Sequence, residues 1–256
     1  MLKCIRVAVL VFIFINQLMA QNNYNLIQFK DETISFLKQP AEWGKNDWLK
    51  VGLAGAAAFA LMQADQSVRT EFMKDRSYYK SFPIETGRLY GELYSPLIFA
   101  GAFGINGWLN NDKTSRKIGY EIIQTTIYAG AITTVLKLAF GRARPFTEKG
   151  TQSFGNQSLF DDSFRSFPSG HTTIAFSIST VLAKNSKSNL VKALCYVPAV
   201  LTALSRVYQD KHWTSDVFLG GLIGYSIGSW VTSTHYDKEF LRINAPEQLS
   251  IVIPLN

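Results

Sequence analysis

The sequence predicts an all-α protein organised as a six-helix bundle, and three observations support this fold class. Six apolar segments have the length and composition of helices. No alternation of apolar and polar residues typical of strands occurs before the last residues of the chain. Glycine and alanine are dense in several segments, which lets neighbouring helices approach closely. The six predicted helices cover residues 47–63, 91–109, 115–140, 170–183, 190–206 and 215–232.

The chain begins with the pattern of a secretory signal peptide, which we assign to residues 1–20. Lys3 and Arg6 precede an unbroken apolar run at residues 7–15, and a polar stretch follows Ala20, after which we place the cleavage. The alternative is an uncleaved anchor helix, but the apolar run is short for a membrane span. We therefore expect the mature chain to be exported to the cell envelope, on the periplasmic face.

Two segments flank the helical domain, which we place at residues 47–236. Residues 21–46 are a polar lead-in, expected to hold a short amphipathic helix that ends in a turn at Pro40. Residues 237–256 are a C-terminal tail, in which we expect residues 248–254 to be extended.

Composition limits the partners of this chain. Loss of the signal peptide removes Lys3 and Arg6 and lowers the formal net charge from +7 to +5, which suits an anionic substrate or an anionic membrane surface. No dense basic stripe accompanies this charge, so we expect no nucleic-acid partner. Cys195 is the one cysteine left after cleavage, which excludes an intrachain disulfide in the mature chain. The sequence carries no signal for an oligomeric state.

Two predicted helices contain uncharged runs long enough to cross a bilayer, at residues 93–111 and 217–236. The other four are shorter or carry a charged residue such as Lys50, Glu121 or Lys192. We therefore expect membrane association. If the signal peptide is cleaved and all six helices span the membrane, the loops after the third and fifth helices lie in the cytoplasm. Three interpretations remain: the site faces the cytoplasm, some helices do not span the membrane, or the N-terminal apolar run is neither cleaved nor inserted.

Three polar patches interrupt the apolar scheme, each at the end of a predicted helix. The first closes the third helix, where Lys137 and Arg144 lie seven residues apart and can project from one helical face. Pro145 is expected to end that helix. The simpler interpretation is a pair of basic residues favoured by the helix dipole.

The second patch opens the fourth predicted helix. Ser169, Gly170 and the free N–H groups of a helix N-terminus can form a cradle for an anion. His171 follows directly and can donate a proton to an oxygen that leaves this cradle. The simpler interpretation is an ordinary N-cap serine.

The third patch lies between the fifth and sixth predicted helices. His212 and Asp216 are four residues apart, so on a helix they face the same way, and the carboxylate can hold one ring nitrogen while the other stays nucleophilic. Arg206 adds a planar fork of donors that suits a phosphate-like anion. The simpler interpretation is a surface ion pair at a helix end.

No metal or other cofactor is expected at these patches. Two histidines, His171 and His212, with one carboxylate are a poor zinc set, and no carboxylate-rich magnesium site occurs in the sequence. The third histidine, His235, lies in a polar segment and is expected to be a surface residue without partners.

Taken together, the patches read Lys-x6-Arg-Pro (137–145), Pro-Ser-Gly-His (168–171) and Ser-Arg-x5-His-x3-Asp (205–216). This order and spacing resemble the three-part signature of the phosphatidic acid phosphatase type 2 / vanadium haloperoxidase superfamily. The resemblance covers about residues 47–232 and includes the six-helix plan. It is specific for the superfamily and leaves the substrate open.

The resemblance implies a role for each motif residue. His212 would attack phosphorus and form a phosphohistidine, with Asp216 orienting its ring. His171 would protonate the leaving oxygen and then activate water. The phosphoryl oxygens would be held by Lys137, Arg144, Ser169, Gly170 and Arg206.

Four functions compete on these grounds. The first is a metal-independent phosphatase that hydrolyses a phosphomonoester or pyrophosphate of a membrane lipid, favoured by the apolar helices and the basic charge. The second is a soluble secreted acid phosphatase of broad specificity, and the third, less favoured, is a vanadium haloperoxidase. The fourth is a catalytically silent protein that keeps the fold, against which the intact histidines argue. Substrate selection is expected to depend on the loops at residues 64–90 and 146–167.

Overall fold

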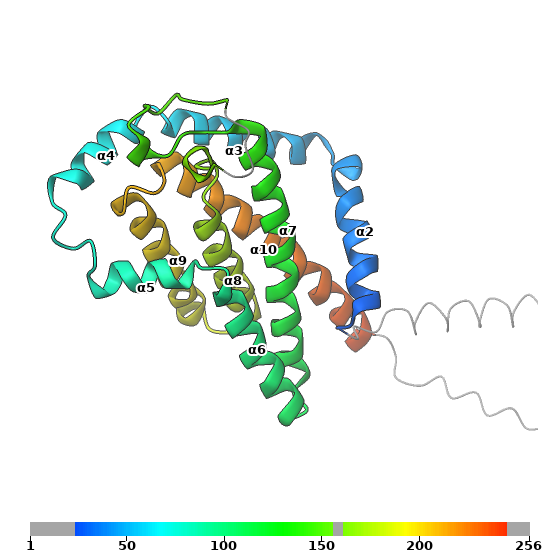
Figure 1. Ribbon diagram of the computed structural model, residues 1–256. Coiled ribbons are helices and arrows are strands. Elements are labelled where there is room, and N and C mark those ends of the chain that lie inside the picture. Colours follow the sequence, from blue (N-terminus) through cyan, green and yellow to red (C-terminus); the bar gives the residue numbers. More distant parts are fainter. Residues whose placement is uncertain (1–23, 156–160, 245–256) are drawn as a thin grey trace, which may run out of the picture.

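The structure, a computed structural model, describes residues 24–155 and 161–244 (Figure 1). The predicted signal peptide and the extended segment at 248–254 lie outside the described residues. The described part is helical, with two short 3-10 turns at Pro145–Thr147 and Asp162–Phe164. Its α-helices are α2 (Leu26–Glu42), α3 (Lys45–Leu61), α4 (Asp65–Lys74), α5 (Phe82–Tyr90), α6 (Tyr94–Leu109), α7 (Lys113–Phe140), α8 (Gly170–Asn185), α9 (Asn189–Tyr208) and α10 (Thr214–Asn244).

The all-α prediction is confirmed, and the six predicted helices correspond to α3, α6, α7, α8, α9 and α10. The number of helices differs, because the lead-in forms α2 and the segment at 64–90, interpreted as a loop, forms α4 and α5. Pro40 does not end α2, which continues to Glu42 although proline has no N–H to donate to the carbonyl oxygen four residues earlier. Helix α10 continues to Asn244, so the first residues of the predicted C-terminal tail, 237–244, are helical.

Helix α8 is the centre of the bundle and packs against α7, α9 and α10. Ile174 and Ile178 of α8 meet Ile122 of α7 in a buried apolar core that also includes residues of α6. Burial of such side chains is the main favourable term in folding such a bundle, at about 25 cal/mol per Å² of apolar surface.

The glycine face of α10 brings that helix into contact with α8. A Cβ atom at Gly220 would lie 2.5 Å from the carbonyl oxygen of Ser169, and one at Gly224 would lie 2.4 Å from that of Thr173. Only glycine fits at such distances, so these residues let the first turn of α8 lie directly on α10. The close packing predicted for this face is confirmed, and it positions the start of α8.

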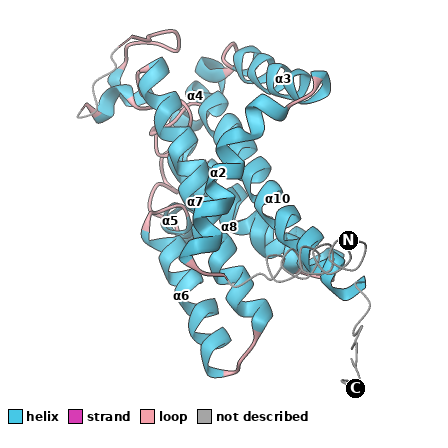
Figure 2. Cartoon of the chain, turned by 90° about the vertical axis from the view of Figure 1, so that its right-hand side faces the viewer, coloured by secondary structure: helices cyan, strands magenta, loops and turns pink. Residues whose placement is uncertain are grey.

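The three motif patches meet at one end of the bundle, the upper end in Figure 1. Helix α7 ends there, α8 begins there, and the α9–α10 connection turns there. Helix α3 lies across the same end and packs against α10 (Figures 1 and 2). The topology therefore gathers residues from 137 to 216 around one position.

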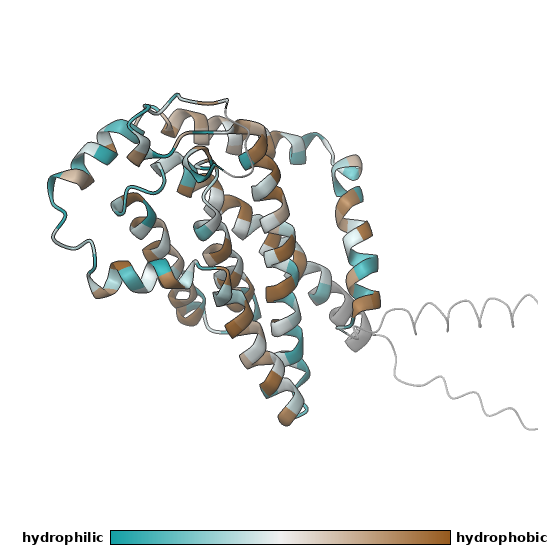
Figure 3. Cartoon of the chain, viewed as in Figure 1, coloured by the Kyte–Doolittle hydropathy of each residue, from teal (hydrophilic) through white to brown (hydrophobic). Residues whose placement is uncertain are grey.

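Apolar residues are frequent along the outer helices (Figure 3), and many of the large ones are exposed. Within the described residues, α7 and α9 are long and apolar enough to cross a membrane. Helix α6 contains one of the two uncharged runs noted in the sequence, but with 16 residues it is about 24 Å long, short of a bilayer core of about 30 Å. Exposed apolar residues include Trp48, Leu53 and Phe59 of α3, Leu97, Ile98, Ile105 and Trp108 of α6, and Leu190, Leu194, Val197 and Leu204 of α9.

His235 is fully buried, and the prediction that it is a surface residue without partners is wrong. Its Nδ1 lies 2.9 Å from Oε1 of Glu121, and its Nε2 lies 3.2 Å from Oε2 of Glu32. Both carboxylates are buried as well, and Gln124 donates to Glu32 at 2.9 Å. The imidazole therefore joins α10 to α2 and α7. His235 thus belongs to a buried network, although the sequence around it is polar.

Replacing His235 by glutamine is expected to lower the free energy of unfolding by about 1–3 kcal/mol, because at least one buried carboxylate loses a donor. Thermal unfolding in detergent measures the effect, with Thr234→Ala as the control, since that hydroxyl bonds only to the Trp230 carbonyl oxygen of its own helix. Equal melting temperatures for the His235 variant and the wild type would contradict a structural role of the imidazole.

Candidate active site

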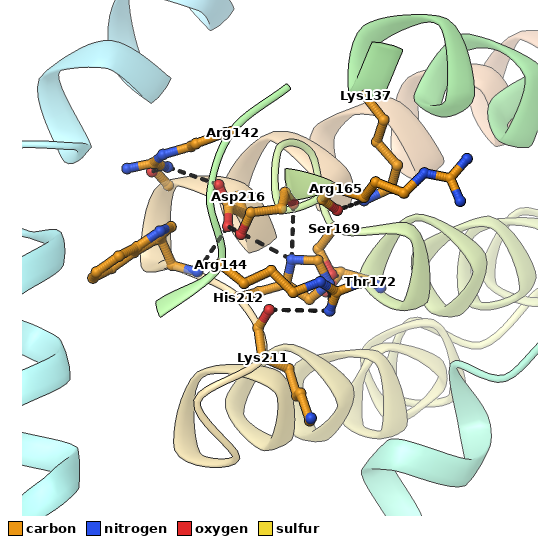
Figure 4. Close-up of polar contacts among 12 residues, drawn as sticks. Lys137, Arg142, Arg144, Arg165, Ser169, Thr172, Lys211, His212 and Asp216 are labelled. Atoms are coloured by element: carbon orange, nitrogen blue, oxygen red, sulfur yellow. Dashed lines mark hydrogen bonds and ion pairs between the residues drawn. The ribbon is translucent and has the colours of Figure 1, made fainter. Parts of the chain in front are cut away.

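The His212 side chain is buried in the connection between α9 and α10, with one ring nitrogen committed and the other available (Figure 4). Nδ1 lies 2.8 Å from the carbonyl oxygen of Ser166. A carbonyl oxygen only accepts hydrogen bonds, so Nδ1 carries the proton and Nε2 keeps its lone pair. Nε2 lies 3.5 Å from Nη1 of Arg144, so the lone pair faces a cation.

Buried cations around His212 lower the pKa of its imidazole well below the usual value. Burial is the largest cause, followed by the positive charges of Arg144, Lys137 and Arg206, and by His171. At neutral pH the ring is therefore uncharged, which is the form a nucleophile needs.

Asp216 lies in the first turn of α10, but it does not hold the His212 ring directly. Its Oδ2 is 3.6 Å from Nδ1 of His212, and the Ser166 carbonyl takes the hydrogen bond that the four-residue spacing assigns to the carboxylate. The carboxylate accepts instead from the Ser166 hydroxyl and, at 2.8 Å, from the backbone N–H of Trp213. Asp216 thus fixes both segments that flank the imidazole.

A second buried carboxylate and an arginine support Asp216. Arg142 donates to Oδ1 of Asp216 at 2.7 Å and to Oδ2 of Asp65 at 2.7 Å. Ser215 binds Asp65 through its backbone N–H at 2.9 Å and through its hydroxyl at 2.6 Å. The sequence analysis missed both residues: Arg142 is an unspecified position inside the first motif, and Asp65 lies on α4, far from every motif.

The first motif reaches the site from a loop and not from one helical face. Gly141 ends α7 in the left-handed conformation (φ 52°) and donates its N–H to the Lys137 carbonyl oxygen at 3.0 Å. The common helical face predicted for Lys137 and Arg144 is therefore wrong, as is the prediction that Pro145 ends the helix. Lys137 Nζ binds the Arg165 carbonyl oxygen, and Arg144 Nε donates to the Asp162 carbonyl oxygen at 2.8 Å.

The remaining predicted anion-binding groups surround the start of α8 and the end of α9. Ser169 is the N-cap of α8, and its hydroxyl oxygen accepts the Thr172 N–H at 3.4 Å, as in the simpler interpretation. Gly170 leaves open space in which a Cβ would meet only Lys137 Cε, at 3.8 Å. Within the described residues, Nε of Arg206 is buried without a hydrogen-bond partner, so this donor is available to a ligand.

His171 follows Gly170 and lies at a cavity that leads to the site. The cavity has a volume of about 640 Å³, and both Arg144 and Arg206 line it with His171. Burial, the charge of Arg206 and that of Arg144 lower the pKa of His171 to about 4, although Glu92 acts in the opposite direction. Helix α5 and the connection between α5 and α6 supply Glu85, Arg88 and Glu92 to the same lining.

All eight predicted site residues therefore lie at one end of the bundle, within one group of buried and partly buried polar side chains. An all-helical bundle with this group at one end is the architecture that the sequence motifs imply. Residues 120–240 match the family model of the PAP2 superfamily. Over these residues the chain resembles the PAP2 superfamily.

Comparisons with individual proteins agree with this resemblance. The chain is 32% identical over 108 residues to a lipid A 1-phosphatase of Porphyromonas gingivalis, covering 40% of this chain and 21% of that protein. It is 31% identical over 120 residues to an undecaprenyl-diphosphatase of Sulfolobus acidocaldarius, covering 47% of this chain and 54% of that protein. The chain thus spans about half the length, or less, of these curated relatives.

Two solved structures share the fold. A transmembrane PAP2 type phosphatidylglycerolphosphate phosphatase from Bacillus subtilis superposes with a TM-score of 0.59 at 22% identity, covering 77% of this chain and 96% of that chain. LpxE from Aquifex aeolicus superposes with a TM-score of 0.50 at 24% identity, covering 66% of this chain and 93% of that chain. At these identities the likeness concerns the fold.

Proposed function

We propose that this protein is a metal-independent phosphatase that hydrolyses a phosphomonoester or pyrophosphate of a membrane lipid through a phosphohistidine intermediate. One observation carries the proposal: a buried imidazole, His212, presents an unprotonated Nε2 toward the guanidinium of Arg144. The names of the relatives, a lipid A 1-phosphatase and an undecaprenyl-diphosphatase, support a lipid substrate.

In the first half-reaction, Nε2 of His212 forms a bond to phosphorus as the bond between phosphorus and the leaving oxygen breaks. His171, protonated once the phosphoryl anion offsets the nearby arginines, transfers its proton to that oxygen. The products are the dephosphorylated alcohol, or the monophosphate of a pyrophosphate substrate, and a phosphohistidine at His212. His171 is then neutral.

In the second half-reaction, neutral His171 takes a proton from water, and the hydroxide oxygen bonds to phosphorus as the bond to Nε2 breaks. Inorganic phosphate leaves, and both histidines return to their starting states. Lys137, Arg144 and Arg206 stabilise the charge that spreads over the phosphoryl oxygens in both steps, and Ser169 and the Gly170 N–H add neutral donors.

The membrane supplies the substrate in this proposal. Exposed apolar side chains on α3, α6 and α9, together with the two helices long enough to cross a bilayer, support membrane association. We further propose that the signal peptide exports the chain and that the site acts at the periplasmic face, with residues 47–236 as the catalytic domain.

A substrate panel tests the proposal with the full mature chain in detergent. The panel contains a water-soluble aryl phosphate, phosphatidic acid and a polyprenyl pyrophosphate, each with and without chelator and vanadate, and His212→Ala is the blank. Chelator-resistant, vanadate-sensitive release of phosphate from a lipid, absent in the variant, is the expected result. Turnover of only the soluble ester would indicate a secreted acid phosphatase, and turnover that survives in His212→Ala would overturn the mechanism.

A further inference from the structure

One wall of the active-site cavity is a chain of charged and polar side chains, most of which lie outside the sequence motifs. Nε of Arg88 donates to Glu85 at 2.9 Å, and its Nη1 donates to Oε1 of Glu92 at 2.8 Å. Gln209 donates to Glu85 at 3.0 Å and accepts from Arg206 at 3.2 Å. This network extends from Arg206 on α9 to Glu92 at the start of α6.

At its far end the network meets His171. Oε1 of Glu92 lies 3.5 Å from Nε2 of His171, and both side chains are more than two-thirds buried. The same carboxylate oxygen accepts the Arg88 hydrogen bond, so Arg88 holds the Glu92 carboxylate in place beside the imidazole. Glu92 is therefore a carboxylate partner of His171, which the sequence analysis did not identify.

Two close approaches bring Glu92 to this position. A Cβ at Gly91 would lie 2.8 Å from the His171 carbonyl oxygen and 2.6 Å from Cγ2 of Thr202. The hydroxyl of Thr202 donates to the Gly87 carbonyl oxygen at 2.6 Å, and a Cβ at Gly87 would lie 2.4 Å from the carbonyl oxygen of Leu201. Glycine at both positions lets the end of α5 lie against α8 and α9.

The other charges around His171 oppose its protonation. Arg206 of α9 and Arg144 of the loop after α7 are cationic, and His212 lies within the same electrostatic group. Glu92 is the carboxylate whose charge and hydrogen bond favour the imidazolium form, against burial and the two arginines. A general acid in this position needs such a counterion.

We propose that Glu92 is a positioning residue for His171: it orients the imidazole and stabilises its protonated form, so that the proton is available to the leaving oxygen. The inference rests on the proposed phosphatase function, in which that proton moves from His171 to the oxygen as the bond between phosphorus and oxygen breaks. Glu92 itself neither gains nor loses the proton.

The leaving group separates this role from general damage to the fold. An alkoxide is a poor leaving group and needs the proton, whereas a nitrophenolate leaves without one. The Glu92→Gln variant is therefore expected to lower kcat for a long-chain alkyl phosphate by about 10-fold or more, with less than a 3-fold effect on 4-nitrophenyl phosphate. A variant that merely loosens the bundle would slow both substrates alike.

The pH profile supplies the second readout. Activity in the first half-reaction needs protonated His171 and is lost as pH rises through its pKa in the substrate complex. Removal of the negative charge lowers that pKa, so the alkaline limb of the kcat profile for the alkyl phosphate is expected to move to lower pH by about one unit.

The experiment compares the full chain carrying Glu92→Gln, Glu92→Asp or Glu42→Gln, the last an exposed carboxylate as the matched control. Partial recovery in Glu92→Asp and wild-type behaviour in Glu42→Gln are expected. Equal slowing of both substrates, or an unmoved alkaline limb, would overturn the role of Glu92. Turnover in His212→Ala would instead count against the phosphatase mechanism, so the two failures are distinguishable.

Discussion

Replacing His212 by alanine is expected to lower kcat for lipid phosphate hydrolysis by at least about 10⁴-fold, because the change removes the nitrogen proposed to attack phosphorus. The arginines and the helix N-terminus remain, so substrate binding and KM are expected to change little. The loss is expected in the chemical step, since Nε2 is the atom proposed to form the covalent bond and no neighbouring group in the described site duplicates it.

Rapid-quench labelling with a radioactive phosphate ester measures this directly. The wild type is expected to hold an acid-labile, base-stable phosphoryl group, as a phosphoramidate does, and His212→Ala is expected to hold none. His235→Gln is the matched control, because it also removes a buried imidazole but one about 25 Å away along α7 from the site. Labelling of the His212 variant would show that another residue is the nucleophile.

Replacing Arg142 by alanine is expected to lower the free energy of unfolding by about 3–5 kcal/mol, because two buried carboxylates lose their shared cation. Asp65 and Asp216 are fully buried, and each lies 2.7 Å from the guanidinium. The substitution also leaves the Thr151 carbonyl oxygen without the guanidinium, which donates to it at 2.8 Å and 3.0 Å. Activity is expected to fall as well, since Asp216 fixes the segments around His212.

Thermal unfolding in detergent checks this effect, and a fall in the melting temperature of about 10 °C is expected. Arg116→Ala is the control: the residue is exposed and its guanidinium donates to the Gly107 carbonyl oxygen and to exposed Asn111, with no carboxylate among its hydrogen-bond partners in the described part of the chain, so its effect is expected to stay below about 1 kcal/mol. Equal melting temperatures for the two arginine variants would contradict a buried charge network. The double variant Asp65→Asn, Arg142→Ala is expected to be less than additive.

The motifs predicted the grouping of the site well because their residue types and their places at helix ends carry the information. Lys137, His171 and His212 each stand next to a helix terminus in the sequence, and a bundle brings such termini together at its two ends. Local details followed less well. Gly141 ends α7 before Arg144. A glycine at this position is itself a helix-termination signal, but the sequence analysis relied on Pro145.

The supporting residues could not be predicted, since their function depends on partners far away in the chain. Asp65 reaches Ser215 across 150 positions, and Glu92 stands at the start of an apolar predicted helix, 79 positions before His171. His235 was predicted wrongly for the same reason: its partners Glu32 and Glu121 lie 203 and 114 positions away. Local polarity distinguishes a solvated surface from a buried network only when the partners are known.

The hydrogen bond from His212 Nδ1 to the Ser166 carbonyl oxygen means that a main-chain group determines the tautomer of this histidine. An amide oxygen neither titrates in the range where enzymes work nor changes with the side chain above it. The proposed nucleophile therefore keeps one tautomer wherever its ring is neutral, and a pH profile of this protein should report the ionisation of its imidazoles, with Asp216 contributing through the shape of the loop.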